Sequence, residues 1–146
     1  MILGIVGCEA AKFTVETEIL ARLVIRRAIG LTMATFPGIR VVSGACHLGG
    51  IDIWAIEEAK DFGVETQEFP PAMQSWTNGY RLRNIQIAQQ SDKVICITVK
   101  VLPAGYAGMR FERCYHCNTL DHVKSGGCWT VKYARTIGKA GEVIAV

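Results

Sequence analysis

Short apolar runs alternate with longer amphipathic segments along this chain of 146 residues. Continuous apolar runs that end at a glycine or a turn are typical of strands buried in a parallel sheet, whereas apolar positions three and four residues apart are typical of helices. The pattern predicts five strands, at 2–7, 39–44, 64–69, 92–99 and 142–146. It predicts four helices between them, at 16–30, 51–63, 80–91 and 129–141.

Strands that alternate with helices imply right-handed crossovers and a parallel sheet. We therefore expect an α/β fold: one domain over residues 1–146, with a doubly wound, mostly parallel, five-stranded Rossmann-like sheet and helices on both faces. The first helix is expected to end at Gly30 and to face the core with Ile19, Leu20, Leu23, Val24 and Ala28. The second is expected to use Ile51, Trp54, Ala55, Ala59 and Phe62.

Residues 100–127 interrupt the alternation, because they hold glycine, proline and aromatic residues without sustained periodicity. A loop of this length inside a compact domain is usually functional or held by a local structure. Residues 114–130, which overlap the end of this loop, contain three of the six cysteines and two of the three histidines. We therefore expect a Cys/His-rich insertion, at about 100–126, before the last helix.

The cysteines and one histidine of this insertion have the spacing of metal ligands. Cys114, Cys117, His122 and Cys128 form C-x2-C-x4-H-x5-C, one residue longer than the C-x2-C-x4-H-x4-C of zinc knuckles. Three thiolates and one imidazole suit tetrahedral Zn²⁺, and four protein ligands leave no open position for catalysis. The spacing predicts a structural zinc site, with His116 pointing elsewhere. Redox or catalytic thiols and incidental clustering are the alternatives.

Composition and charge limit the classes of function. Half of the residues are apolar and a fifth are charged, which is typical of a globular protein. The net charge of +3 is small and its basic residues are scattered, so nucleic acid is a secondary partner. The chain starts without a basic signal-peptide region, and no apolar run approaches the roughly twenty residues of a membrane span. We therefore expect a cytoplasmic protein, in which clustered thiols stay reduced and bind metal or catalyse reactions.

Ligands of open parallel sheets bind beyond the carboxyl ends of the strands, where helix N-termini present free amides. Three segments take such positions: "GCEAAKF", "SGACHLGGID" and "GGCWT". Asp52, in the first turn of its helix, is placed to bind a ribose hydroxyl or to cap the helix. Thr130 and the amides before it are placed to hold an anion. Glycine turns before helices are also common without any ligand.

The third predicted helix begins with Arg81, Arg83 and Asn84 at the same edge of the sheet. Arginine offers a planar fork for phosphate, and asparagine offers a donor and an acceptor for a base or sugar. Trp76, just upstream, is placed either to stack on a base or to cover the edge of the core. A solvated helix start is the plainer interpretation of the two arginines.

The order of "GIVGCEA", "VVSGACHLGGIDIWAIEEAKDFG", "FPPAMQSW", "GYRLRNIQIAQQSDKVICI" and "GGCWTVKYARTIGK" resembles the SLOG superfamily of Rossmann-like domains. The resemblance is greatest to its small stand-alone YspA/YpsA-like branch, and it spans the chain from Gly4 to the final strand. The superfamily also contains the lonely-guy (LOG) phosphoribohydrolases and the single-strand DNA-binding protein DprA. The most specific shared features are a strand ending in Ser-Gly, an Asp and an Arg-Asn pair at two helix starts, and a Gly-Gly-x-x-Thr loop.

The resemblance implies a pocket for a nucleotide or nucleotide-derived ligand. The residues expected around it are Gly7, Gly44, Gly49, Gly50, Asp52, Arg83, Asn84, Gly126, Gly127 and Thr130. The loop 45–50 is longer than the usual SLOG version, so the resemblance does not name the ligand. In LOG enzymes a Gly-Gly-x-Gly-Thr-x-x-Glu motif supplies a catalytic carboxylate, and here Trp129 and Tyr133 take the places of its third glycine and its glutamate. A tyrosine with a pKa of about 10 does not replace an ionised carboxylate, so the resemblance leaves turnover open.

Three functions follow from these patterns. The first is a nucleotide-binding sensor or nucleotide-processing protein with a structural zinc clip, expected to be a homo-oligomer because relatives of this fold often pair through helices. The second is a module for single-stranded nucleic acid, using Tyr115, Trp129, Arg110, Arg113 and Lys124. The third is an N-glycosidase in which the missing carboxylate is supplied by Glu9, Asp52 or Glu112.

Overall fold

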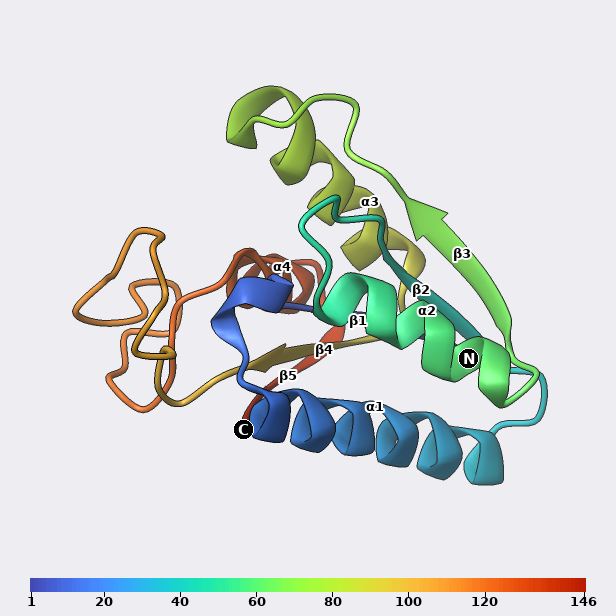
Figure 1. Ribbon diagram of the computed structural model, residues 1–146. Helices are drawn as coiled ribbons and strands as arrows, with labels where there is room; N and C mark the ends of the chain where they lie inside the picture. Colours follow the sequence, from blue (N-terminus) through green and yellow to red (C-terminus); the bar gives the residue numbers. More distant parts are fainter.

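The computed structural model, which describes all 146 residues, confirms the predicted α/β class (Figure 1). Five parallel strands form one sheet in the order β3-β2-β1-β4-β5. The strands are β1 (Ile2–Gly7), β2 (Arg40–Gly44), β3 (Glu65–Phe69), β4 (Lys93–Thr98) and β5 (Ala140–Ala145). The helices are α1 (Val15–Thr35), α2 (Ile51–Asp61), α3 (Arg81–Gln90) and α4 (Gly126–Thr136), with short turns η1 (Ala10–Lys12) and η2 (Trp76–Tyr80).

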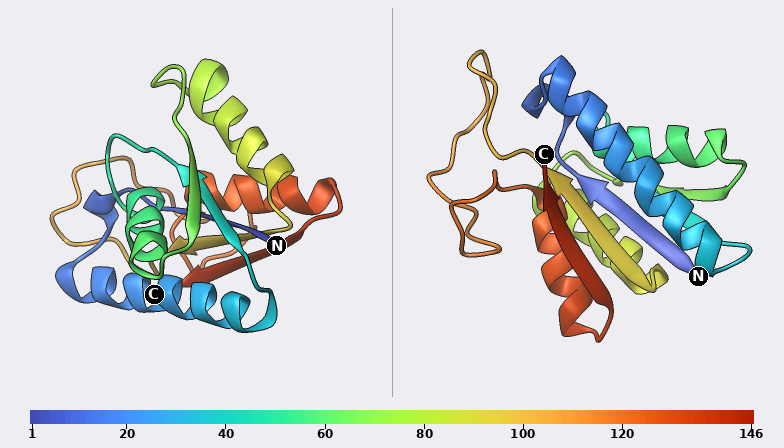
Figure 2. Two further views of the ribbon diagram at one scale, coloured as in Figure 1. Left: turned by 90° about the vertical axis from the view of Figure 1, so that its right-hand side faces the viewer. Right: turned by 90° about the horizontal axis from the view of Figure 1, so that it is seen from below.

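Helices cover both faces of the sheet (Figure 2). One core lies against α1 and α2 and includes Leu3 and Ile5 of β1, and the other lies against α3 and α4 and includes Val6. The central strand β1 therefore sends apolar side chains to both faces, as its continuous apolar run predicts. The chain runs outward from β1 to β2 and β3 and then crosses to β4. This reversal leaves a crevice at the carboxyl ends of β1 and β4, where ligands bind in folds of this kind.

The structure corrects the prediction for α1 in two respects. The fully buried side chains that face the sheet are Ala21, Ile25 and Ile29. Val24 and Ala28 are half-buried and pack against the same core, as expected, whereas Ile19, Leu20 and Leu23 are exposed.

Gly30 does not end α1, because the helix continues to Thr35. It stops at Phe36, since the ring of Pro37 disfavours the helical conformation of the residue before it. Neither this helix, the longest of the chain, nor any other has the length and apolar composition needed to cross a membrane.

The other helices follow the predictions more closely. In α2, Ile51, Trp54, Ala55 and Ala59 are buried as expected, and Phe62 packs against the same core. The last helix, α4, begins three residues earlier than predicted, at Gly126, because the side chain of Ser125 caps it by accepting from Cys128 N. It ends at Thr136, shortly before Gly138, whose φ of 77° suits a helix C-terminus.

The insertion between β4 and α4 contains no helix and projects beyond the carboxyl edge of the sheet (Figure 2). It is fixed to the last residue of β4 and the residue after it by two hydrogen bonds, from Thr98 Oγ1 to Val123 O at 2.6 Å and from Val123 N to Val99 O at 2.8 Å. Its outer part is fixed by the Tyr106 hydroxyl, which donates to Glu9 Oε1 at 2.9 Å. The insertion therefore stands over the crevice between β1 and β4.

Candidate metal centre and ligand pocket

The structure brings together the four residues predicted as metal ligands. The ligand atoms of Cys114, Cys117, His122 and Cys128 all lie within 4.8 Å of one another. Sulfur and nitrogen ligands about 2.0–2.3 Å from a tetrahedral ion stand at comparable separations. These side chains are therefore positioned to bind one metal ion.

A tight hairpin holds the first two thiols. Cys114 and Thr119 form an antiparallel bridge, with Cys114 N donating to Thr119 O at 2.9 Å and Thr119 N donating to Cys114 O at 3.2 Å. Asn118, directly after Cys117, has a φ of 58°, a left-handed conformation that asparagine tolerates better than most residues. The turn thereby directs the thiols of both cysteines to the same side of the chain.

His122 is oriented by a neighbouring carboxylate. Its Nδ1 lies 2.7 Å from Asp121 Oδ1, and its Nε2 lies 3.7 Å from Cys128 Sγ. A carboxylate that accepts a hydrogen bond from one ring N–H fixes the tautomer in which the other nitrogen has a free lone pair. Nε2 is therefore the atom that faces the metal position. His116 stands outside the four-ligand set, as predicted, and lines the pocket described below.

The ionisation of the clustered thiols favours a cation among them. A hydrogen bond from Cys96, whose Sγ lies 3.9 Å away, is the main cause that lowers the pKa of Cys128 to about 4. Burial, and then the charge of Cys128, raise the pKa of Cys117 to about 12. Burial also raises the pKa of Cys114. Without a cation only Cys128 ionises readily, because a second negative charge beside it is unfavourable. A metal ion among the three sulfurs supplies the positive charge that would let all of them bind as thiolates.

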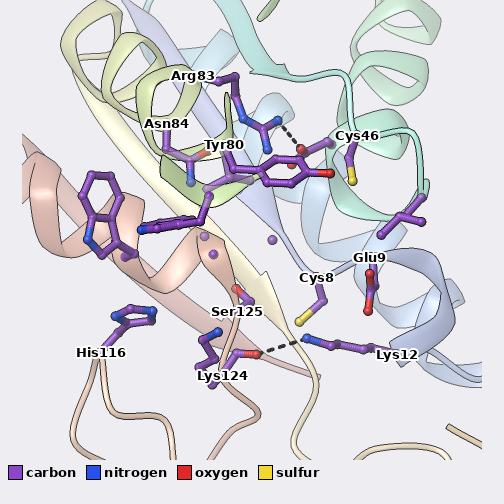
Figure 3. Close-up of a pocket in the computed structure, with 18 of the residues that line it drawn as sticks. Cys8, Glu9, Lys12, Cys46, Tyr80, Arg83, Asn84, His116, Lys124 and Ser125 are labelled. Atoms are coloured by element: carbon purple, nitrogen blue, oxygen red, sulfur yellow. Dashed lines mark hydrogen bonds and ion pairs between the residues drawn. The ribbon is translucent and has the colours of Figure 1, made fainter. Parts of the chain in front are cut away.

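A cavity of about 610 Å³ lies beside the metal centre, at the carboxyl ends of β1 and β4 (Figure 3). The turn after β1, the β2–α2 loop, η2, the start of α3, the insertion and the start of α4 all contribute walls. The lining residues are Val6, Gly7, Cys8, Glu9, Lys12, Cys46, Leu48, Asp52, Trp76, Tyr80, Arg83, Asn84, Tyr115, His116, Lys124, Ser125, Gly126, Gly127 and Trp129. The pocket occupies the place that the strand order predicts for a ligand.

Main-chain atoms and glycines form the floor of the pocket. A Cβ added to Gly127 would lie 2.7 Å from Cys96 Sγ and 3.0 Å from Gly7 Cα, and a Cβ on Gly7 would overlap Ile97 O. Real Cβ atoms do not approach other atoms so closely, so β1 and α4 meet here only because both positions are glycine. Gly126 has more room, since the nearest atom to its Cβ position is Asn84 Nδ2 at 3.8 Å.

Two buried polar side chains at the start of α3 face this pocket. The Arg83 side chain is 8% exposed; its Nη1 donates to Asp52 Oδ2 at 2.7 Å, and its Nε has no hydrogen-bond partner. Asn84 is 4% exposed, and its side-chain amide forms no hydrogen bond within the protein. The sealed Nε of Arg83 is out of reach of the cavity. Arg83 and Asn84 nevertheless line the cavity, so the donors that they direct into it are available to a ligand.

Asp52 lines the pocket, whereas Gly44 contributes to it indirectly. Asp52 was expected to bind a ribose hydroxyl or to cap α2; its side chain does not cap the helix, and its carboxylate forms a buried ion pair with Arg83. Burial raises the pKa of Asp52, and Arg83 opposes this shift. A Cβ on Gly44 would overlap the guanidinium of Arg83 and approach the carboxylate of Asp52. Gly44 therefore makes room for the ion pair, although it does not line the pocket.

Three further sequence-predicted residues lie outside the pocket lining. Gly49 and Gly50 have φ values of 70° and 89°, and a Cβ on Gly50 would overlap Cys8 O. These two glycines let the β2–α2 loop approach the end of β1. Thr130 is fully buried, and its hydroxyl donates to Gly126 O at 3.1 Å within α4. Its hydroxyl therefore does not face the position of an anion.

The structure adds pocket residues that the pattern did not single out. Lys12 reaches across the pocket and donates from Nζ to Lys124 O at 3.3 Å, and Cys8, Cys46 and Tyr80 complete the wall (Figure 3). Lys12 belongs to the segment "GCEAAKF", which follows the first strand, and this position was its only signal in the sequence. Cys8 lies in the same segment and Cys46 in "SGACHLGGID", so they had the same positional signal. Tyr80 precedes the predicted Arg83 and Asn84 at the start of α3.

Aromatic rings border the other side of the pocket. Trp76 and Trp129 meet edge to face at a centroid distance of 5.2 Å, and Trp129 stacks on Tyr133 at 5.4 Å. Trp76 is 42% exposed, so it presents free ring surface beside the cavity. Tyr133 stacks on Trp129 and does not line the pocket.

No family model, curated protein or solved structure matches this chain. The geometry shows three thiols and an imidazole positioned to bind a metal ion. Beside them lies a pocket whose buried polar groups include an arginine and an amide with unused hydrogen-bonding capacity. The chemistry of these two features supports the proposals that follow.

Proposed function

We propose that the pocket binds a nucleotide or nucleotide-derived ligand through its phosphate, and that the protein acts as a sensor or a nucleotide-processing protein. The observation that carries this proposal is a set of buried polar groups around the cavity whose capacity the protein does not use. Arg83 and Asn84 are more than 90% buried and face the pocket. A ligand with several acceptor oxygens satisfies such donors.

The phosphate position is the start of α4. The first N–H groups of a helix have no partner within the helix, and the helix dipole adds partial positive charge there. Gly126 and Gly127 present these groups to the cavity without side chains in the way. Lys12, Lys124 and Arg83 surround the same space. An anionic group at this end of the pocket therefore meets both amides and cations.

The aromatic border suits the base of such a ligand. Trp76, Tyr80 and Trp129 line the cavity on the side of η2 and α4, and flat rings of this kind stack on nucleobases. The volume of about 610 Å³ falls within the range of about 300–1,000 Å³ that small-molecule sites occupy. The pocket thus combines an anionic end with an aromatic end, as a nucleotide does.

We further propose that the metal is structural Zn²⁺ and that it shapes this pocket. Three thiolates and an imidazole favour zinc, and four protein ligands close its coordination sphere. Tyr115 and His116 lie between the first two ligands, and Lys124 lies between the last two. All three line the cavity. Fixing the ligands therefore fixes one wall of the pocket.

The resemblance to the SLOG superfamily remains part of the proposal. It is supported by the Arg-Asn pair of α3 and by the glycine start of α4, both of which line the pocket. Among the carboxylates considered for N-glycosidase activity, Glu9 lines the cavity, Asp52 is paired with Arg83, and Glu112 is exposed in the insertion. Glu9 is therefore the residue to test, and an absence of free base after incubation with nucleoside monophosphates would exclude this activity.

Calorimetric titration tests ligand binding. The probes are nucleoside 5′-monophosphates, the matching nucleosides and inorganic phosphate, and we expect the monophosphates to bind most tightly. Asn84→Asp places a negative charge beside the phosphate and should weaken binding by roughly tenfold or more. Gln86→Glu adds the same charge to the same helix at an exposed position and should leave binding unchanged.

Two results would contradict these assignments. If no monophosphate binds while single-stranded oligonucleotides bind with strong salt dependence, the nucleic-acid module is the better description. If chelation removes the metal without changing monophosphate affinity, the metal does not shape the pocket.

A further inference from the structure

The outward side of α1 is apolar and no other element covers it. The side that faces the sheet is formed by Ala21, Ile25 and Ile29. The opposite side carries Val15, Ile19, Leu20, Leu23 and Leu31, which are 49–73% exposed. Figures 1 and 2 show α1 as the outermost layer on its side of the sheet. A helix that is apolar on both sides is typical of one that is covered on both sides.

The charges on this helix divide into two groups. Arg22 and Arg26 form salt bridges within the chain, to Glu58 among others, at 3.0 Å and 2.6 Å. Glu16 and Arg27 are exposed and form no salt bridge. They are eleven residues apart, which is about three helical turns or roughly 16 Å, so they share one side of α1 but do not reach each other.

These two free charges are complementary to a second copy of the same face. In an antiparallel pair of α1 helices related by a two-fold axis, Glu16 of each copy stands beside Arg27 of the other. The same two-fold axis sets Leu20 beside Leu23 of the other copy. Positions 16 and 27 and positions 20 and 23 are both centred between residues 21 and 22, so one axis relates both pairs. A face that matches itself in this way is the requirement for an isologous dimer.

We propose that the outward face of α1 is a homodimer interface in which two α1 helices pack antiparallel, with Leu20 and Leu23 at the centre and Glu16–Arg27 pairs at both ends. The balance of charges favours this occupant over a membrane surface. Helices that lie on anionic lipid carry several basic residues beside the apolar face, whereas the free charges here are one acidic and one basic residue. The proposal is independent of ligand binding in the pocket.

The mass of the full-length protein in solution, from light scattering and sedimentation, tests the interface. We expect a dimer of twice the 16.0 kDa chain mass, and a monomer for the double variant Leu20→Asp, Leu23→Asp. Both side chains are about half exposed, and an unchanged circular dichroism spectrum verifies that this variant folds.

Charge reversal tests the direction of pairing. Arg27→Glu should raise the dissociation constant roughly tenfold or more, because two attractions become two repulsions. Adding Glu16→Arg to the same chain should restore dimerisation. Lys132→Glu, an exposed change on α4 across the sheet, serves as the control.

Three outcomes would overturn the proposal. They are a monomeric wild-type protein, a dimer that persists in the Leu20→Asp, Leu23→Asp variant, and a Glu16→Arg, Arg27→Glu variant that does not regain dimerisation. None of them bears on the pocket, so the proposed nucleotide binding is tested separately.

Discussion

Removing the metal should lower the stability of the whole domain and not only that of the insertion. Two of the four ligands, Cys114 and Cys128, are fully buried and belong to the same core cluster as Val6, Val42 and Val131. Cys128 also lies in the first turn of α4. Loss of the ion therefore leaves unpaired thiols in the core between α4 and the sheet, and the unfolding of the insertion is coupled to that of the domain.

The size of the effect follows from mass action. An ion that binds only the folded protein stabilises it by about 2.7 kcal/mol at 100 times its dissociation constant and by about 4.1 kcal/mol at 1,000 times. For a chain of this length, 1 kcal/mol corresponds to roughly 2–4 °C in Tm. Chelation should therefore lower Tm by about 5–16 °C.

Differential scanning calorimetry with and without a chelator measures this shift, and elemental analysis of the purified protein gives the metal content. Cys117→Ser should abolish the response to chelator, because one of the four ligands is gone. Cys46→Ser is the matched control, since Cys46 is a partly buried cysteine on another wall of the pocket. The control should keep both the metal and the full shift in Tm.

An unchanged Tm after verified removal of the metal would refute this reasoning. It would mean that the insertion opens independently of the core, despite the buried positions of Cys114 and Cys128. A shift of equal size in Cys117→Ser would refute it as well, because the chelator would then act at some other site.

Three further predictions concern single positions. Asp121→Asn weakens the hydrogen bond that orients His122 and should reduce metal affinity by about 10–100-fold, as measured by competition with a chromogenic chelator. Gly30→Ala should raise the free energy of unfolding in urea by about 0.5–1 kcal/mol, because Gly30 lies inside α1 and an added Cβ meets no atom within 4 Å. Gly127→Ala should lower it by about 1–3 kcal/mol, because the new methyl group would crowd Cys96 and Gly7. A Gly30→Ala variant less stable than the wild type, or a Gly127→Ala variant as stable as the wild type, would contradict the respective prediction.

The sequence was sufficient for the features that depend on local spacing. Apolar runs that end at a glycine or a turn predicted β1, β2 and β4, and the C-x2-C-x4-H-x5-C spacing predicted the four metal ligands that the structure brings together. Arg83 and Asn84 could be found because a helix start after a parallel strand must lie at the carboxyl edge of the sheet.

The orientation of α1 could not be found in the same way. Ala21, Ile25 and Ile29 have helical spacing, and so do Ile19 and Leu23 on the other side. A helix with two apolar faces offers no pattern that chooses between them, and only packing against the sheet decides.

The details of the pocket depend on tertiary structure. Asp52 pairs with Arg83 across 31 positions of sequence, and Lys12 reaches a carbonyl in the insertion 112 positions away. Thr130 turns its hydroxyl into its own helix, which motif spacing alone does not reveal. Long-range partners of this kind leave no periodic trace in one sequence.

The contact between Gly7 and Gly127 also determines how this pocket can change. Its floor consists of main-chain atoms at a point where neither residue can accept a methyl group, so substitutions there alter the fold before they alter the choice of ligand. If the pocket binds the proposed ligand, its selectivity would vary through the walls, chiefly Trp76 and Tyr80 on one side and Tyr115 and His116 on the other. Because the last two residues lie between the ligands Cys114 and Cys117, an engineer could exchange residues 115 and 116 alone and change specificity with the metal ligands and the floor unaltered.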